Sequence, residues 1–151
     1  MQRARPQLSL KGRALRYLSQ REHSRSELQR KLAKHVEDQG EIARVLDELQ
    51  ARGFIDHARV ADSIVHRKAA KLGAMRIRQE MKQKGVEAPL VAAAMEKLKA
   101  TEVARAREVW RRKFASAPAD ANERAKHARF LAARGFSAEV INRVLKGAGD
   151  D

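Results

Sequence analysis

The sequence predicts an all-α protein made of three tandem three-helix repeats, nine helices in total. Three observations predict this fold class. Apolar residues recur at helical spacing, as in Ile42, Val45, Leu46 and Leu49, which stand at relative positions 0, 3, 4 and 7. Aromatic residues make up only 4% of the 151 residues, and runs of β-branched residues that favour strands are scarce. The apolar pattern also repeats about every 50 residues.

Capping residues and glycines predict the ends of the first helices. Ser24 and Glu27 have the spacing of a capping box, which begins the second helix. Gly53 ends the third helix, because glycine adopts the left-handed conformation at the smallest cost. Asp56 is expected to cap a fourth helix that continues to about residues 72–73.

Similar signals predict the helices of the second half. A short helix over residues 74–84 is followed by a helix that opens at residues 86–89, because proline is tolerated in a first turn. Thr101 and Ser137 are expected to cap the seventh and ninth helices. Residues 115–122 predict a loop before the eighth helix.

An internal repeat arranges these helices in threes. A shift of 49 positions brings Leu28 onto Ile77, and a further shift of 50 brings Gly85 onto Gly135. The one poor match is His127, which falls on the position of Ile77. We therefore expect three similar units with the same helix order.

The repeats set the expected domain organisation. Repeats are expected at residues 10–54, 55–99 and 100–147, after a basic leader at residues 1–9 and before a tail at 148–151. Each unit is near the lower size limit for independent stability, so neighbouring units should stack. At about 8–10 Å between packed helices, an elongated body of about 60–70 Å is expected.

The charge predicts a polyanionic partner. The chain has 33 basic and 19 acidic residues, a net charge of +14, and the excess is spread over its whole length. A small soluble domain needs a net charge of only about 2–8, so nucleic acid is the first candidate partner. The densest basic run lies between Arg67 and Lys84. A second basic cluster surrounds Glu108 and consists of Arg105, Arg107, Arg111, Arg112 and Lys113.

The sequence contains no pattern typical of an enzyme. It has no cysteine, no HExxH pair and no glycine-rich phosphate loop, so neither a metal site nor a cofactor is expected. The five histidines are expected at the surface or at helix ends. No apolar stretch reaches the about 18 residues of a membrane span, and no export signal is recognisable, so a cytoplasmic protein is expected.

The aromatic residues are too few for the stacking platforms of single-strand binders. Trp110 and Phe114 have helical spacing and are expected in the core. Tyr17, beside Arg16, is the aromatic residue that we expect to be exposed.

Four segments, in order along nearly the whole chain, resemble the RecX family of recombinase regulators. They are LRYLSQREHS at residues 15–24, LQARGFID at 49–56, IRQEM at 77–81 and FLAARGF at 130–136. Two positions depart from the family pattern. His57 stands where a second acidic residue is frequent, and Val60 stands where an aromatic residue is usual. Valine at position 60 indicates packing rather than contact with a partner.

The resemblance implies a curved, elongated tandem-repeat fold and binding to the RecA recombinase. Members of the family resemble negative regulators that lie in the groove of the RecA–DNA filament. There they suppress ATPase, strand exchange and coprotease activity and limit filament growth, and many also bind DNA directly. On this hypothesis we expect a monomer whose basic face contacts the filament or single- or double-stranded DNA without sequence specificity. The expected residues are Arg16, Arg21, Arg67, Lys68, Lys71, Arg76, Arg78, Lys82 and Lys84.

Two other functions are compatible with the sequence. Three-helix units also resemble helix-turn-helix modules, so a stand-alone DNA-binding protein is the main alternative. No helix has an evident base-reading face, and DNA binding is therefore expected to be non-specific. An RNA-associated helical protein is a further alternative, which the charge allows but no RNA-binding motif supports.

Overall fold

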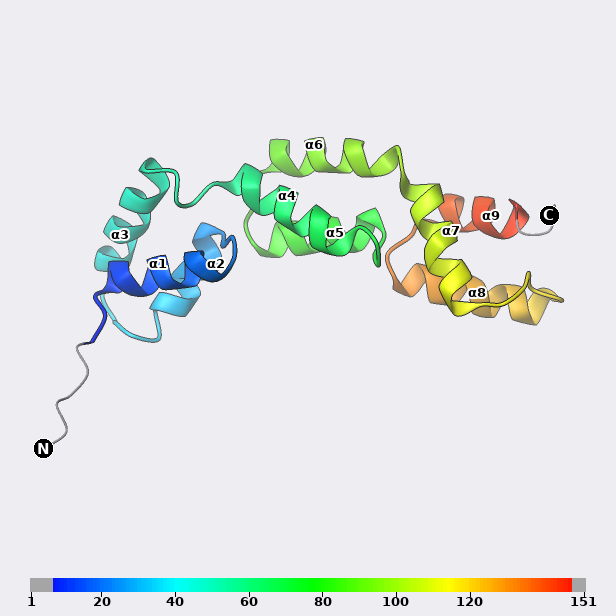
Figure 1. Cartoon of the computed structure of the whole chain (residues 1–151), viewed down its shortest axis with the longest axis horizontal. Coiled ribbons are helices and arrows are strands. Elements are labelled where there is room, and N and C mark those ends of the chain that lie inside the picture. The colour runs from blue at the N-terminus through cyan, green and yellow to red at the C-terminus, as the bar shows by residue number, and fades with distance from the viewer. Residues whose placement is uncertain (1–6, 148–151) are drawn as a thin grey trace, which may run out of the picture. The chain divides into compact units, whose positions relative to one another are not determined.

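A computed structural model describes residues 7–147, which fold into nine helices without a strand (Figure 1). The predicted tail at residues 148–151 and most of the predicted leader at residues 1–9 lie outside the described range. Within that range, the all-α class and the nine helices are confirmed. The helices are α1 (Leu10–Gln20), α2 (Arg25–Leu32), α3 (Gln39–Ala51), α4 (His57–Lys68), α5 (Ala74–Gln83), α6 (Ala88–Lys99), α7 (Glu102–Lys113), α8 (Ala121–Ala133) and α9 (Ala138–Gly147).

The chain forms two compact units, which are described separately. The first consists of the residues up to Val60 together with Lys84–Val86, and it contains α1, α2 and α3. The second consists of Ala61–Gln83 and the residues from Glu87 onward, and it contains α5 to α9.

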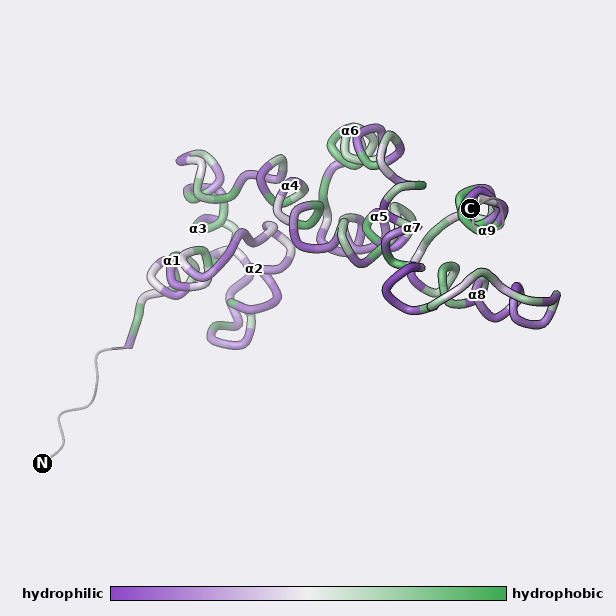
Figure 2. The backbone as a smooth tube through the Cα atoms, turned by 45° about the vertical axis from the view of Figure 1, so that its right-hand side comes forward, coloured by the Kyte–Doolittle hydropathy of each residue, from purple (hydrophilic) through white to green (hydrophobic). Residues whose placement is uncertain are grey.

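The core of the first unit forms where α1, α2 and α3 pack against one another. Leu28, Leu32 and Leu49 are completely buried there, with Ile42 and Leu46 almost so. Hydrophobic and hydrophilic stretches alternate along the helices in Figure 2, as expected for helices with one buried face. The helical spacing of apolar residues in the sequence therefore marks the residues that form the core.

In the second unit, α5 packs against α6, and α7, α8 and α9 pack around a common core. Ile77 and Met81 of α5 are completely buried. The common core of the last three helices is built around Trp110, with Phe114 packed at its margin. Both aromatic residues thus take the core positions expected from their spacing.

Several predicted caps are present. The Ser24 hydroxyl accepts from the backbone N–H of Glu27, and the Glu27 carboxylate accepts from the backbone N–H of Ser24, which completes the capping box. Asp56 accepts from two backbone N–H groups at the start of α4, and Ser137 accepts from that of Val140. Thr101 is the N-cap residue of α7, but its hydroxyl donates to the Leu98 carbonyl instead of capping the helix.

The fourth helix is shorter than predicted. It ends at Lys68 instead of residues 72–73, and the chain then turns. The Arg105 guanidinium stabilises this turn, because one of its nitrogens donates to the carbonyls of Ala69 and Leu72 at 3.0 and 2.9 Å. This contact joins residues more than thirty positions apart, which helical periodicity cannot reveal.

The poor match in the repeat is explained by hydrogen bonding. His127 is 5% exposed and occupies a core position, as Leu28 and Ile77 do in their repeats. The indole N–H of Trp110 donates to Nδ1 of His127 at 3.0 Å, and the imidazole stacks on Phe114. A buried indole N–H needs an acceptor, which an apolar residue at position 127 could not supply. The expectation that every histidine lies at the surface or a helix end was therefore wrong for His127.

Candidate functional site

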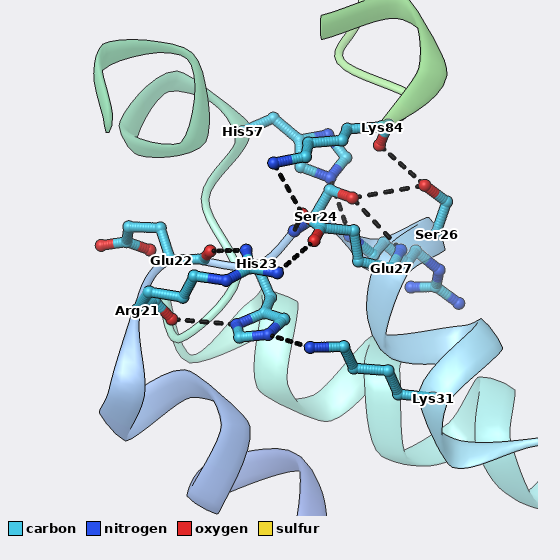
Figure 3. Close-up of polar contacts among 10 residues, drawn as sticks. Arg21, Glu22, His23, Ser24, Ser26, Glu27, Lys31, His57 and Lys84 are labelled. Atoms are coloured by element: carbon cyan, nitrogen blue, oxygen red, sulfur yellow. Dashed lines mark hydrogen bonds and ion pairs between the residues drawn. The ribbon is translucent and has the colours of Figure 1, made fainter. Parts of the chain in front are cut away.

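Two of the nine predicted basic residues form part of a buried polar network in the first unit (Figure 3). The Glu27 carboxylate is at its centre, with its side chain 7% exposed. Arg21 donates to it at 2.7 Å, and the Lys84 ammonium lies 3.9 Å from it. The Ser26 hydroxyl donates a hydrogen bond to the backbone carbonyl of Lys84 at 2.7 Å. Arg21 and Lys84 therefore stabilise the fold of the unit through Glu27.

The network keeps Glu27 ionised. Burial on its own would raise the pKa of this carboxyl. The hydrogen bonds from Arg21 and from the Ser24 N–H, together with the positive charge of Lys84, outweigh burial and lower the pKa below its ordinary value. The carboxylate is thus the anionic partner of two cations that the sequence assigned to a binding face.

His23 is completely buried beside this network, and it lies at a helix end, directly before Ser24, the N-cap residue of α2. Its Nδ1 lies 3.0 Å from the Arg21 carbonyl, which can only accept, so Nδ1 carries the proton. Nε2 then accepts from the Lys31 ammonium at 2.9 Å. Burial is the largest cause that lowers the pKa of His23, and the charges of Arg21 and Lys31 lower it further. His23 is therefore held neutral by its surroundings.

Arg16 lies in the first unit beside a shallow hollow of about 300 Å³. Its side chain is exposed, whereas Tyr17 is half-buried and packs against the core. The Lys31 ammonium lies 4.8 Å from the centre of the Tyr17 ring. Tyr17 is thus less exposed than expected. Of the two neighbours Arg16 and Tyr17, Arg16 is the one whose side chain is exposed.

Helix α5 separates two kinds of basic residue. Arg78 and Lys82 are exposed and lie one turn apart on the face that also carries Met75, which is 62% exposed. Arg76 is exposed as well, but its guanidinium donates to the backbone carbonyl of Ala133 at 2.7 Å. Arg76 therefore joins α5 to the end of α8, while Arg78 and Lys82 are available to a partner.

The remaining predicted residues lie around the end of α4. Arg67 is exposed, and half-buried Lys68 lines a hollow of about 460 Å³ that also contains Arg76 and Glu80. Lys71 is in the turn after α4 and lines a different hollow, of about 200 Å³. We call the latter the α7–α8 hollow. Its lining residues are Ala70, Lys71, Val109, Arg112, Lys113, Phe130 and Arg134.

The second basic cluster of the sequence is divided by the fold. Arg105 is turned inward, and Arg111 pairs with Glu108 at 3.0 Å. Arg112 and Lys113 lie at the α7–α8 hollow together with Arg134. Sequence reasoning missed Arg134 as a site residue, because it is far along the chain from the other basic residues of the hollow.

The structure adds two findings, one about metal ligands and one about membrane-spanning helices. Among residues 7–147, no group of three or more histidine, aspartate or glutamate side chains is placed to hold a metal ion. In the same part of the chain, none of the helices has the length and apolar character needed to cross a lipid bilayer.

Comparison with known proteins identifies the family. The first, second and third three-helix domains of RecX match residues 11–49, 56–95 and 100–145. The regulatory protein RecX of Leptothrix cholodnii is 57% identical over 94% of this chain and 90% of its own length. The chain belongs to the RecX family.

A second sequence relative and a crystal structure support the assignment to this family. The regulatory protein RecX of Ralstonia nicotianae is 47% identical over 95% of this chain and 91% of its own length. The crystal structure of RecX from Lactobacillus salivarius superposes with a TM-score of 0.79 and covers 94% of this chain and 96% of that chain. The two sequences are only 20% identical, so the likeness to this crystal structure shows that the fold is shared and nothing more.

The two departures from the RecX pattern have internal roles. Nε2 of His57 accepts from the backbone N–H of Arg25 at 3.2 Å, which satisfies a group at the start of α2. A carboxylate at position 57 could accept the same hydrogen bond. Val60 is 2% exposed, which confirms the packing role expected for it.

The buried histidines predict acid sensitivity in this RecX chain. Burial is the main cause that lowers the pKa of His23 and of His127 below the ordinary value of 6.5. The unfolded chain therefore binds protons that the folded chain excludes, and the free energy of unfolding falls as the pH drops below about 6.5. Urea unfolding between pH 7.5 and pH 5.5 measures this loss.

Controls separate these histidines from other groups. Replacing both, as His23→Gln with His127→Gln, should flatten the pH dependence, whereas His35→Gln at an exposed position should not. Glu27 does not interfere, because its ordinary pKa of 4.5 places its titration at lower pH. A pH dependence that survives the double replacement would contradict the prediction.

Proposed function

We propose that this RecX chain is a negative regulator of the RecA recombinase. It binds in the groove of the RecA–DNA filament, inhibits ATP hydrolysis, strand exchange and coprotease activity, and limits filament growth. Through these effects it regulates recombination, DNA repair and the SOS response, as a cytoplasmic monomer without enzymatic activity of its own. The observation that carries the proposal is the match to all three RecX domains in order along the chain.

The distribution of charge supports this role. The net charge is +14, and exposed cations occur in both units, at Arg16 in the first and at Arg67, Arg78 and Lys82 in the second. A filament groove that contains DNA phosphates and acidic protein surface attracts the positive charge of each unit. Charge complementarity of this kind speeds association and makes it sensitive to salt.

A titration of the full chain into preformed filaments of RecA, single-stranded DNA and ATP tests the proposal. ATP hydrolysis is followed at about 150 mM salt, which is close to physiological ionic strength. We expect inhibition at far fewer molecules of the chain than of RecA. Inhibition only when enough protein is present to cover the DNA would instead support a stand-alone, non-specific DNA-binding protein.

Reversing the exposed charges of α5 tests the basic face. Arg78→Glu with Lys82→Glu should weaken inhibition about tenfold or more, which corresponds to about 1.4 kcal/mol of binding free energy. Arg76 is left unchanged, because its hydrogen bond to Ala133 serves the fold. The readout is the concentration of the variant that halves ATP hydrolysis.

The matched control reverses two exposed lysines of α6, as Lys97→Glu with Lys99→Glu. This variant has the same net charge as the α5 variant and should retain most of the inhibition. Equal weakening by the two variants would show that total charge matters and that the α5 face is not a specific contact.

A further inference from the structure

The α7–α8 hollow concentrates positive charge that the fold does not neutralise. Its rim carries Lys71 from the turn after α4, Arg112 and Lys113 from the last turn of α7, and Arg134 from the end of α8. Within residues 7–147, none of these four cations forms an ion pair. Helix C-termini favour basic residues, but that preference does not require side chains from three segments to converge.

Two neighbouring basic residues of α7, unlike the cations of the hollow, have carboxylate partners. On the same helix, Arg105 lies 3.7 Å from the Glu102 carboxylate and Arg111 lies 3.0 Å from Glu108. Four cations held close together repel one another, and an anionic ligand would relieve that repulsion. The hollow therefore has the electrostatics of an anion-binding site.

The floor of the hollow is apolar. Val109 and Phe130 line the hollow together with the cations, and the Phe114 ring contacts Phe130 edge to face at 5.5 Å between centroids. The Arg134 guanidinium and the Lys113 ammonium lie 5.0 and 5.8 Å from the centre of the Phe130 ring. These cation–π contacts keep both charges beside the apolar surface. A matching ligand has anionic groups next to an apolar part.

The hollow is smaller than a typical pocket for a whole small molecule. Its volume of about 200 Å³ is smaller than the pockets of about 300–1,000 Å³ that enclose small molecules. A ligand that lies across it and extends beyond it in both directions fits better than an enclosed metabolite. Two arginines on the rim suit phosphate, whose oxygens can accept paired guanidinium hydrogen bonds, as carboxylate oxygens also can.

We propose that the α7–α8 hollow binds the backbone of single-stranded DNA, with a sugar on the Phe130–Val109 floor and the flanking phosphates on the four cations. A single strand suits this arrangement because its flexible backbone lets one sugar or base turn toward the Phe130 ring, whereas pairing and stacking hold the bases of a duplex. Phe130 supplies one contact and not the row of stacking aromatic residues that the sequence lacks. The assignment extends the proposed function, since it gives the chain its own contact to the DNA strand. It is tested without RecA, so its failure and that of filament inhibition are separate results.

The test measures binding of the full chain to a fluorescently labelled oligothymidylate by anisotropy at several salt concentrations. The variant Arg112→Gln with Arg134→Gln removes two rim charges and keeps polar side chains at both positions. Its salt slope should be shallower than that of the unmodified chain by about 1.4, because each phosphate contact on a single strand contributes about 0.7. Binding at low salt should weaken at least tenfold, with an unchanged melting temperature.

The control variant is Lys97→Gln with Lys99→Gln, which removes two charges from exposed positions on α6 of the same unit. It should change the slope much less than the hollow variant does. A duplex of the same length should show no larger change with the hollow variant than with the control. Equal slopes for the two variants on the single strand would overturn the assignment. So would a hollow variant whose binding changes as much on the duplex as on the single strand.

An oligoglutamate peptide of equal charge is the probe for acidic protein segments. If the hollow variant loses affinity for this peptide while its DNA binding is unchanged, the hollow is a protein-binding site and the proposal is wrong. Loss of DNA affinity without loss of peptide affinity supports it.

Discussion

Glu27→Ala is expected to lower the free energy of unfolding of the first unit by about 2–4 kcal/mol, because it leaves buried groups without their partner. The carboxylate accepts from Arg21 and from the backbone N–H of Ser24, and it attracts Lys84 at 3.9 Å. The side chain of Lys84 is only 16% exposed, so water poorly replaces the attraction that it loses when this carboxylate is removed. The side chain of Arg21 is 37% exposed, so water compensates its charge better, which limits the loss of stability.

Two further variants make this prediction specific. Glu27→Gln keeps an acceptor for the Ser24 N–H but removes the charge, and it should fall between the alanine variant and the unmodified chain. Asp47→Ala removes the partner of Arg25, an ion pair whose carboxylate side chain is 70% exposed, and should cost at most about 1 kcal/mol. Urea unfolding followed by circular dichroism measures all three.

The Glu27 network has a consequence for function. It holds Arg21 and Lys84 against the fold, although the sequence places both in the basic face. If their role is structural, Glu27→Ala should reduce RecA inhibition only in proportion to the unfolded fraction. A much larger loss of inhibition in a fully folded variant would show that this region contacts the filament. A loss of stability no greater than that of Asp47→Ala would contradict the network itself.

The sequence predicted those parts of the fold that depend on residues close together in the chain. The capping box of Ser24 and Glu27 and the Asp56 cap each involve groups within three positions, so their spacing alone reveals them. The apolar repeat was equally informative, because corresponding positions such as Leu28 and Ile77 are both fully buried. Local geometry therefore accounts for the helix order and the core.

The candidate site was harder to predict, because charge in a sequence does not show which cations have internal partners. Adjacency grouped Arg76 with Arg78, yet the fold directs Arg76 to a carbonyl 57 positions away and leaves Arg78 exposed. Conversely, Lys71 and Arg134 are 63 positions apart in the printed sequence and line the same hollow. Such distinctions depend on contacts between helices, which no spacing rule records.

One of those contacts explains why the chain turns after α4. Gly73 lies against Gly135, and its backbone N–H donates to the Arg134 carbonyl at 2.8 Å. The N–H of Met75 donates to the Gly135 carbonyl at 3.2 Å in the same contact. A Cβ atom at Gly73 would lie 2.6 Å from the backbone nitrogen of Phe136 and closer still to the backbone of Gly135. Real Cβ atoms do not approach backbone atoms to within 3.0 Å, so the two segments would have to separate.

Gly73→Ala should therefore destabilise the second unit by about 3 kcal/mol or more, through the overpacking itself and the loss of two interhelical hydrogen bonds. Trp110 lies in the core of this unit, so its fluorescence during urea unfolding reports the change. Because Lys71 and Arg134 flank the contact, the α7–α8 hollow should also bind single-stranded DNA more weakly in any fraction that remains folded.

Two comparisons identify the cause of that loss. Gly73 is the residue before α5, and serine is a better N-cap than alanine, so an effect of capping would be relieved in Gly73→Ser. The close approach predicts instead that serine is as harmful as alanine, since both carry a Cβ atom. Gly53 has a φ of +79°, and no atom lies within 4 Å of a Cβ added there. Gly53→Ala should therefore lower the free energy of unfolding by only about 1–2 kcal/mol, the cost of a non-glycine residue in the left-handed conformation. An equal loss of stability at positions 53 and 73 would mean that backbone conformation requires glycine at position 73. Recovery of stability with serine would mean that capping is the cause. Either result would contradict the role of the contact with Gly135.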